Sequence, residues 1–175
     1  METRYHFPVN NSRRYLVILL LWAAFASYVV FSAPRLPDRV ATHFDAAGVP
    51  NGWMTRAGHV RFTLIFGTLA PAFVVGVFTF IRALGGRGMN IPNTDYWLAP
   101  ERQQATVDFV QRRGIWLAGL IVAFIAGIHA SILRANAHAP AVLPLSDVGW
   151  IAGGFGVAIL IWAVTFVVRF LRRPA

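Results

Sequence analysis

Four long apolar stretches alternate with polar segments along the chain. They cover residues 15–32, 60–81, 114–133 and 148–168, and none has Asp, Glu or Lys in its middle. A helix needs about 20 mainly apolar residues to cross the hydrocarbon core of a bilayer. Because lipid offers the backbone no hydrogen bonds, such a stretch crosses as a helix. The pattern predicts an all-α integral membrane protein, a four-transmembrane-helix bundle that forms one membrane domain over residues 1–175.

The two longer segments between the spans have patterns of their own. In the loop 33–59, apolar and polar residues alternate over residues 40–45, which favours a short extended segment, and residues 48–52 have turn chemistry. In the loop 82–113, a helical pattern begins at Pro100 and leads into the third span. We expect a structured loop on the outer side of the membrane and a cytoplasmic helical extension of the third span.

The composition narrows the class of protein further. Apolar residues make up 57% of the chain and charged residues 13%, whereas a soluble domain carries about 25% charged residues. This excludes a water-soluble globular domain, and the high apolar content excludes a largely disordered chain. The absence of cysteine excludes disulfides and thiolate metal sites. All 16 basic residues are arginine, which excludes lysine Schiff-base chemistry and a P-loop lysine.

The arginines are divided unevenly between the two sides of the predicted bundle. Eleven lie in the N-terminal tail, the loop 82–113 and the C-terminal tail, and five lie on the other side. Cytoplasmic segments carry the excess of basic residues in membrane proteins. We therefore expect both termini in the cytoplasm and the loop 33–59 outside. The net charge of +9 then reflects topology and contact with the lipid bilayer, and we expect no nucleic-acid partner.

Small residues recur at intervals of four in the last two spans. Gly119, Ala123 and Gly127 have this spacing in the third span, and Gly149 and Gly153 have it in the fourth. Such a spacing lets two helix backbones approach each other closely. We expect these glycines to pack the helices of the bundle together. The alternative is that one of these faces forms a homo-oligomer.

Three titratable residues on the expected outer side are candidates for chemistry. His43 and Asp45 are two residues apart, so their side chains share a face of an extended segment. His129 lies within the third span, where a polar group faces the bundle and needs a partner. Because His and Asp bind zinc, all three are weak candidates for a metal site. The alternative is a structural, hydrogen-bonded role, and we expect no cofactor. No serine lies in a Gly-x-Ser-x-Gly elbow, so we expect no catalytic residue either.

The loop 33–59 also carries a recognisable motif. Its members are Leu36, Pro37, His43, Phe44, Asp45, Gly48, Gly52 and Trp53. This arrangement resembles the signature of domain of unknown function (DUF) 1648, which lies at the start of SdpI-type toxin-immunity membrane proteins and also occurs in small stand-alone proteins. The resemblance implies an integral protein of the bacterial inner membrane and supplies no catalytic residues. The later SdpI-type domain of the immunity proteins has no counterpart in this sequence.

The loop 82–113 contains a second stretch that is similar to a motif of some stand-alone members of that family. It includes Asn93, Asp95, Tyr96 and Trp97 and is followed by Pro100, Glu101 and Arg102. The aromatic residues of this stretch are expected to be exposed. Together the two motifs extend the resemblance over roughly residues 15 to 110.

Three classes of function are compatible with these features. The first is a non-catalytic membrane protein that acts through protein interaction, in immunity or signalling, and presents the outer motif. The second is an accessory or structural subunit that packs into a larger membrane complex through its small-residue faces. The third is a metal-dependent enzyme or transporter, which is disfavoured because no span carries a buried acidic residue.

The arginine count makes the topology testable. We expect a reporter that is active only in the cytoplasm to be active when fused to the C-terminus, and inactive when inserted in the loop 33–59. A C-terminal fusion that is active only outside the cytoplasm would contradict the assignment.

Overall fold

Four long helices and one β-hairpin make up the part of the chain that the structure, a computed structural model, describes, residues 12–172. The predicted domain's ends at 1–11 and 173–175, with Arg4 and Arg173, lie outside the described residues. The elements are α1 (Ser12–Ser32), a short 3-10 helix (Ala33–Arg35), β1 (Arg39–Phe44), β2 (Pro50–Thr55), α2 (Arg56–Ala83), α3 (Thr94–Trp97), α4 (Pro100–Ala135) and α5 (Leu145–Leu171).

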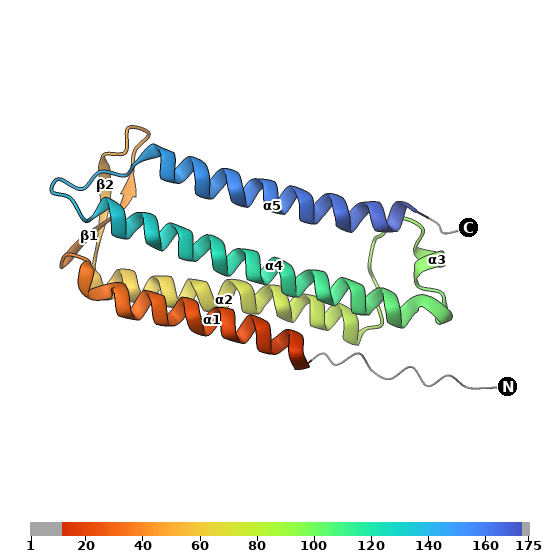
Figure 1. The fold of residues 1–175 in the computed structure, drawn as a ribbon. Helices are drawn as coiled ribbons and strands as arrows, with labels where there is room; N and C mark the ends of the chain where they lie inside the picture. Colours follow the sequence, from red (N-terminus) through yellow and green to blue (C-terminus); the bar gives the residue numbers. More distant parts are fainter. Residues whose placement is uncertain (1–11, 173–175) are drawn as a thin grey trace.

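The four-helix prediction is confirmed. Helices α1, α2, α4 and α5 are each long and apolar enough to span a membrane, and Figure 1 shows them running side by side with the hairpin at one end and α3 at the other. Helix α4 is continuous over 36 residues from Pro100, so the predicted extension of the third span is present. The protein is therefore a multi-pass membrane protein.

The hairpin is the departure from an all-α chain. The predicted extended segment forms β1, and the turn residues that follow lead into an antiparallel partner, β2, that the sequence pattern did not indicate. Strand β2 reads PNGWMT, in which proline, asparagine and glycine are typical of turns rather than strands. Pairing with β1 therefore overrides the preference of these residues for a turn.

Helix α4 is the element on which the others pack. Most of its buried residues recur at intervals of three or four, which gives one seam along the helix. Along this seam, Val122 and Ile125 pack against Phe25 and Val29 of α1. Figure 1 shows α4 between α5 on one side and the α1–α2 pair on the other. A single long helix thus holds the remaining three together.

The predicted glycine contacts are confirmed only in part. A Cβ atom at Gly127 would lie 3.3 Å from Ile151 of α5, and one at Gly119 would lie 3.5 Å from Leu21 of α1, so both glycines lie at helix contacts. The prediction of internal packing is wrong for Gly149 and Gly153, because no atom of the described chain lies within 4 Å of a Cβ placed there. These two glycines lie on the face of α5 that points away from α4. This face contains most of the exposed residues of α5.

The closest helix approaches occur at glycines that the spacing argument did not select. At Gly67 of α2 a Cβ atom would overlap the ring of Phe25. At Gly114 of α4 it would overlap the Cβ atom and the ring of Phe78. Both glycines are buried, so the space that a side chain would need is already filled by an aromatic residue of a neighbouring helix.

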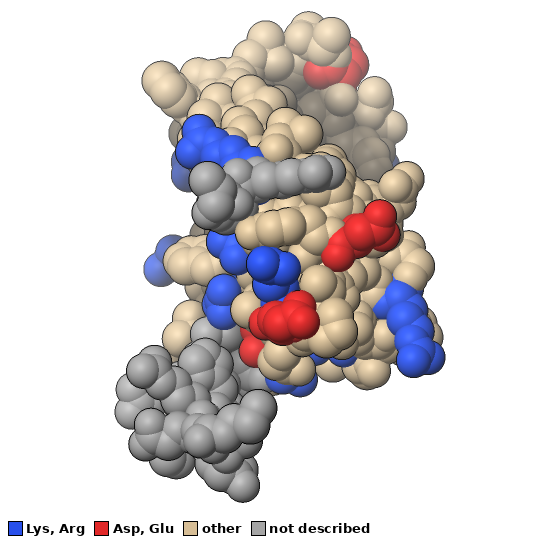
Figure 2. Space-filling view, turned by 90° about the vertical axis from the view of Figure 1, so that its right-hand side faces the viewer, with Lys and Arg blue, Asp and Glu red and all other residues tan. Residues whose placement is uncertain are grey.

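The α3 end of the molecule carries a cluster of charge. Figure 2 looks onto this end and shows arginines gathered there with carboxylates between them. Arg82 is paired with Asp108 at 2.7 Å. Helix α1 begins and α5 ends on this side (Figure 1). Both described ends of the chain are therefore at the same end of the bundle.

The glycine contacts give a test of the packing. We expect Gly114→Ala to lower the stability of the purified protein by about 1–3 kcal/mol, the usual cost of forcing extra atoms into a packed core. Gly76→Ala is the matched control, because its Cβ would meet nothing within 4 Å. Thermal unfolding in detergent compares the two variants, and equal melting temperatures would contradict the Gly114–Phe78 contact.

Candidate functional site: the hairpin cap and the histidine chain beneath it

The hairpin is fastened to the end of α4 by its apolar motif residues. Leu36 and Val40 are fully buried and pack against Ile132 of α4, with Phe44 and Leu133 around them. The predicted apolar face of the motif therefore faces the bundle, as expected for residues that would be costly to leave in water.

The asparagine that caps the C-terminal end of α4 completes this attachment through the strand backbone. The Oδ1 atom of Asn136 accepts from the N–H of Ala41 at 2.8 Å, and its Nδ2 atom donates to the Ala41 carbonyl at 2.9 Å. The side-chain amide thus pairs with β1 as a neighbouring strand would. Strand β1 is held on one edge by β2 and on the other by Asn136 at the end of α4, so the loop 33–59 is an ordered cap.

The remaining polar motif residues shape the turn. Asp45 Oδ1 accepts from the backbone N–H groups of Ala47 and Val49, each at 2.9 Å. Gly48 has a φ of +78°, and a Cβ atom there would overlap the carbonyl oxygen of Leu143 in the α4–α5 loop. Glycine is required by both the backbone conformation and the close approach. Asp45 and Gly48 therefore position the turn against the neighbouring loop.

The shared face predicted for His43 and Asp45 does not form. Strand β1 ends at Phe44, its pairing is irregular on both sides of His43, and Asp45 is already part of the turn. His43 is exposed and lies over Gly52, where a Cβ atom would come within 3.0 Å of its own Cβ. The two residues therefore do not form a joint metal or proton site.

The outward face of the hairpin carries an exposed aromatic residue and a cation. Trp53 is 45% exposed, and the guanidinium of Arg39 lies 4.6 Å from the centroid of its ring. The register places Ala41 opposite Trp53 and Arg39 opposite Thr55, so Arg39 and Trp53 are on one face of the sheet. His43 is paired with Gly52 instead, and a Cβ atom at Gly52 would meet its side chain. We call Arg39 and Trp53 the cap face.

Two histidines from different helices meet beneath the cap. His129 of α4 is 1% exposed and His59 of α2 is 5% exposed. Nδ1 of His129 lies 3.1 Å from Nε2 of His59, and Nε2 of His129 lies 2.8 Å from the hydroxyl of Ser32 in α1. The ring of Tyr28 packs edge-on against His129. One hydrogen-bonded chain thus joins α1, α4 and α2.

The donors in this hydrogen-bonded chain can be assigned from Ser32, the residue at one end of it. The Ser32 hydroxyl donates to the Val29 carbonyl at 3.3 Å, so towards His129 it acts as an acceptor. His129 then donates from Nε2 and accepts at Nδ1 from the Nε2–H group of His59, which makes His129 neutral. If Ser32 instead donates to His129, both bonds reverse direction. In either direction, these bonds satisfy polar groups that lipid cannot.

The structure separates the three predicted metal candidates. His129 is bonded to His59 and Ser32, whereas His43 lies on the hairpin opposite Gly52 and Asp45 lies in the turn. Over residues 12–172, no group of three or more His, Cys, Asp and Glu residues lies close enough to hold a metal ion. The His59–His129 pairing was missed, although a signal was present. The buried residues of α2 are His59, Thr63, Gly67 and Pro71, at intervals of four.

The second motif has a structural role at the other end of the bundle. Asn93 Nδ2 and Trp97 Nε1 both donate to the carbonyl of Phe170, at 2.9 Å and 3.1 Å. This carbonyl is in the last turn of α5, where no intrahelical donor is available. Trp97 is buried, so the expectation of exposed aromatic residues is wrong for it, whereas Tyr96 stacks under Arg102 at 4.1 Å and Asp95 is exposed.

The fold and the cap define the class: a small multi-pass membrane protein with an ordered hairpin over one end of its helices. The model of the family described as "Domain of unknown function (DUF1648)" matches residues 16–67, from α1 through the hairpin into α2. This segment is therefore similar to a DUF1648 domain, and the resemblance seen in residues 36–53 is confirmed. No curated protein and no solved structure matches the chain.

The histidine chain is testable by substitution. We expect His129→Ala to lower stability by about 2–3 kcal/mol, because it opens a cavity and leaves His59 and Ser32 without their partner. His138→Ala, at an exposed position in the loop after α4, is the control and should change little. Thermal unfolding in detergent measures both. If His129→Ala unfolds at the wild-type temperature, the hydrogen bonds of His129 do not hold the three helices together.

Proposed function

We propose that this protein is a non-catalytic protein of the bacterial inner membrane that acts by binding a partner protein outside the cytoplasm, in an immunity-like or signalling-like role. The observation that supports this proposal is that one side of the hairpin is buried against the bundle while other residues of the hairpin stay exposed. Its apolar side faces α4 through Leu36 and Val40, while Arg39, His43 and Trp53 remain exposed. An ordered surface with an exposed tryptophan and arginine is typical of binding sites, because these residues supply most interface energy.

The rigidity of the cap supports the same proposal. The Asn136 clamp, the Asp45 turn and the contact of Gly48 with Leu143 fix the hairpin before any partner arrives. A preformed surface loses little conformational entropy on binding. The arginine count of the sequence supports an outer location for the hairpin, with both termini in the cytoplasm.

The second candidate is an accessory subunit of a larger membrane complex. Its support is the free face of α5, where Gly149, Gly153 and Gly156 have nothing within 4 Å and no residue of the apolar window is buried. Small residues on an uncovered helix face favour contact with another helix. A second copy of this chain and a different membrane protein both fit this face.

Site-specific photo-crosslinking in native membranes separates the two candidates. A crosslinking residue at position 53 samples the cap face, and one at position 153 samples α5. The proposal expects a protein adduct at 53 and none at 153, whereas an accessory subunit expects the reverse. Adducts at neither position would contradict both.

A matched pair of variants then tests the cap face with the partner so identified. We expect Trp53→Ala to weaken binding about ten-fold or more, as loss of an aromatic anchor does. Asn51→Ala, an exposed residue of the same strand, should change binding little. Equal binding by both variants would show that the cap face is not the contact surface.

A further inference from the structure

An apolar groove opens between α1 and α2 and reaches α4 at its floor. Its volume is about 850 Å³, within the range of about 300–1,000 Å³ typical of ligand sites. Its lining includes Trp22 of α1, Pro71 of α2 and Val122 of α4, and none of the described residues that line it is charged. Gly76 of α2 also lines it, and a Cβ atom there would meet nothing within 4 Å, so this glycine leaves the groove open.

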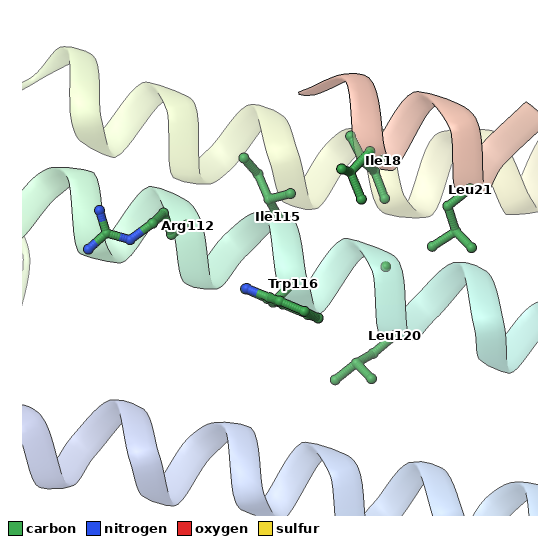
Figure 3. Close-up of a pocket in the computed structure, with 8 residues that line it drawn as sticks. Ile18, Leu21, Arg112, Ile115, Trp116 and Leu120 are labelled. Carbon is green, nitrogen blue, oxygen red and sulfur yellow. The ribbon is translucent and has the colours of Figure 1, made fainter. Parts of the chain in front are cut away.

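A smaller groove between α1 and α4 offers a comparison. Its volume is about 480 Å³, and Figure 3 shows Ile18 and Leu21 of α1 above Trp116 of α4 at this groove. No hydroxyl group is present among the described residues that line it. The groove between α1 and α2 differs, because the hydroxyl groups of Tyr15 and Thr79 line it. Only this larger groove therefore combines an apolar wall with hydroxyl donors.

Three polar side chains meet at the α3 end of the α1–α2 groove. Gln111 Nε2 donates to the hydroxyl groups of Tyr15 and Thr79, and these two hydroxyl oxygens are 3.3 Å apart. Gln111 itself is 3% exposed. The opposite orientation of its amide would leave both hydrogens of the amino group without an acceptor among the described residues, in place of one oxygen. The amide nitrogen is therefore the atom that faces the two hydroxyls.

This arrangement leaves one hydroxyl hydrogen unused. Tyr15 and Thr79 carry one each, and their mutual contact uses only one of the two, because the amide nitrogen of Gln111 accepts none. A threonine can also donate to the carbonyl four residues earlier in its helix. Thr68 donates in this way to Leu64 at 2.7 Å, whereas Thr79 makes no such bond within the described part of the chain. The unused hydrogen is therefore available to a molecule in the groove.

The depth of the two hydroxyls matches the ester groups of a bilayer lipid. Tyr15 is the first residue of the first apolar stretch, and Thr79 lies two residues before the end of the second. Both are thus at the boundary between hydrocarbon and headgroups, where glycerolipids have their ester carbonyls. From Thr79 to Thr68 the groove follows α2 for eleven residues, or about 16 Å. One leaflet is about half of a hydrocarbon core that is about 30 Å thick, so the groove fits one acyl chain.

We propose that the α1–α2 groove binds one acyl chain of a glycerolipid, whose ester carbonyl accepts the unused hydroxyl hydrogen of Tyr15 or Thr79. The ester is recognised rather than the headgroup, because the described lining of the groove carries no charge. A helix of a partner protein fits less well, since its backbone carbonyls are already bonded within the helix. The groove includes no residue of the hairpin, so its test does not depend on the partner proposed above.

Native mass spectrometry of the detergent-purified protein tests recognition of the ester. With equal amounts of diacyl- and dialkyl-phosphatidylglycerol of one chain length, we expect the wild type to retain the diacyl lipid about five-fold better, which corresponds to about 1 kcal/mol for one hydrogen bond. Diacyl-phosphatidylcholine should compete as well as diacyl-phosphatidylglycerol. The double variant Tyr15→Phe, Thr79→Val should retain both linkages equally. Thr68→Val is the control and should keep the preference, because the hydrogen of Thr68 is already donated to Leu64.

A variant that fills the groove keeps the proposal testable if the double variant does not fold. Gly76→Leu should abolish retention of either lipid, whereas Gly153→Leu, at an equally open glycine of α5, should leave it unchanged. The proposal is wrong if the wild type retains the dialkyl lipid equally well, or if retention follows the charge of the headgroup. It is also wrong if Gly76→Leu and Gly153→Leu have the same effect. Circular dichroism of each variant verifies that the helices are intact.

Discussion

Polar contacts inside the bundle hold together helices that the hydrophobic effect alone cannot sort, because lipid tails are as apolar as the side chains they cover. The contacts occur at three levels of the α1–α2–α4 unit. Ser32, His129 and His59 join all three helices below the hairpin. Trp22 donates to Thr68 at 3.0 Å midway. Near the α3 end, Gln111 bonds to Tyr15, which in turn lies 3.3 Å from Thr79. Each contact fixes the register of the helices that it joins, and the position of the cap depends on that register.

Helix α5 is held differently, by its ends and by aromatic contacts. Arg134 pairs with Asp147 at 2.6 Å at the hairpin end, and the Trp162 indole donates to the Arg113 carbonyl at 2.8 Å further along. Between them the rings of Phe124 and Phe155 stack at 4.3 Å. Because α5 has no such contacts on its opposite side among the described residues, it is the helix best placed to contact other membrane components.

The helices could be predicted from the sequence because a span requires a long apolar stretch, and four such stretches were present. The packing of the helices could not be predicted from the sequence. The spacing of four selected Gly149 and Gly153 as readily as Gly119. Which of these glycines lies close to another helix depends on the residues around each position in the folded structure. The prediction of the candidate site from the sequence was limited in the same way. The motif located the hairpin, but the pairing of His59 with His129 joins residues 70 apart, which no local pattern encodes.

The attachment of the hairpin to α4 also bears on the order of assembly during synthesis. The hairpin and His59 both lie within the segment 16–67 that matches the family model, yet their partners are Asn136, the C-cap of α4, and His129 within α4. When α1, the hairpin and α2 leave the ribosome, the edge of β1 and the imidazole of His59 still lack those partners. The cap is completed only once α4 has been inserted. The segment defined by sequence similarity is thus shorter than the unit that folds cooperatively.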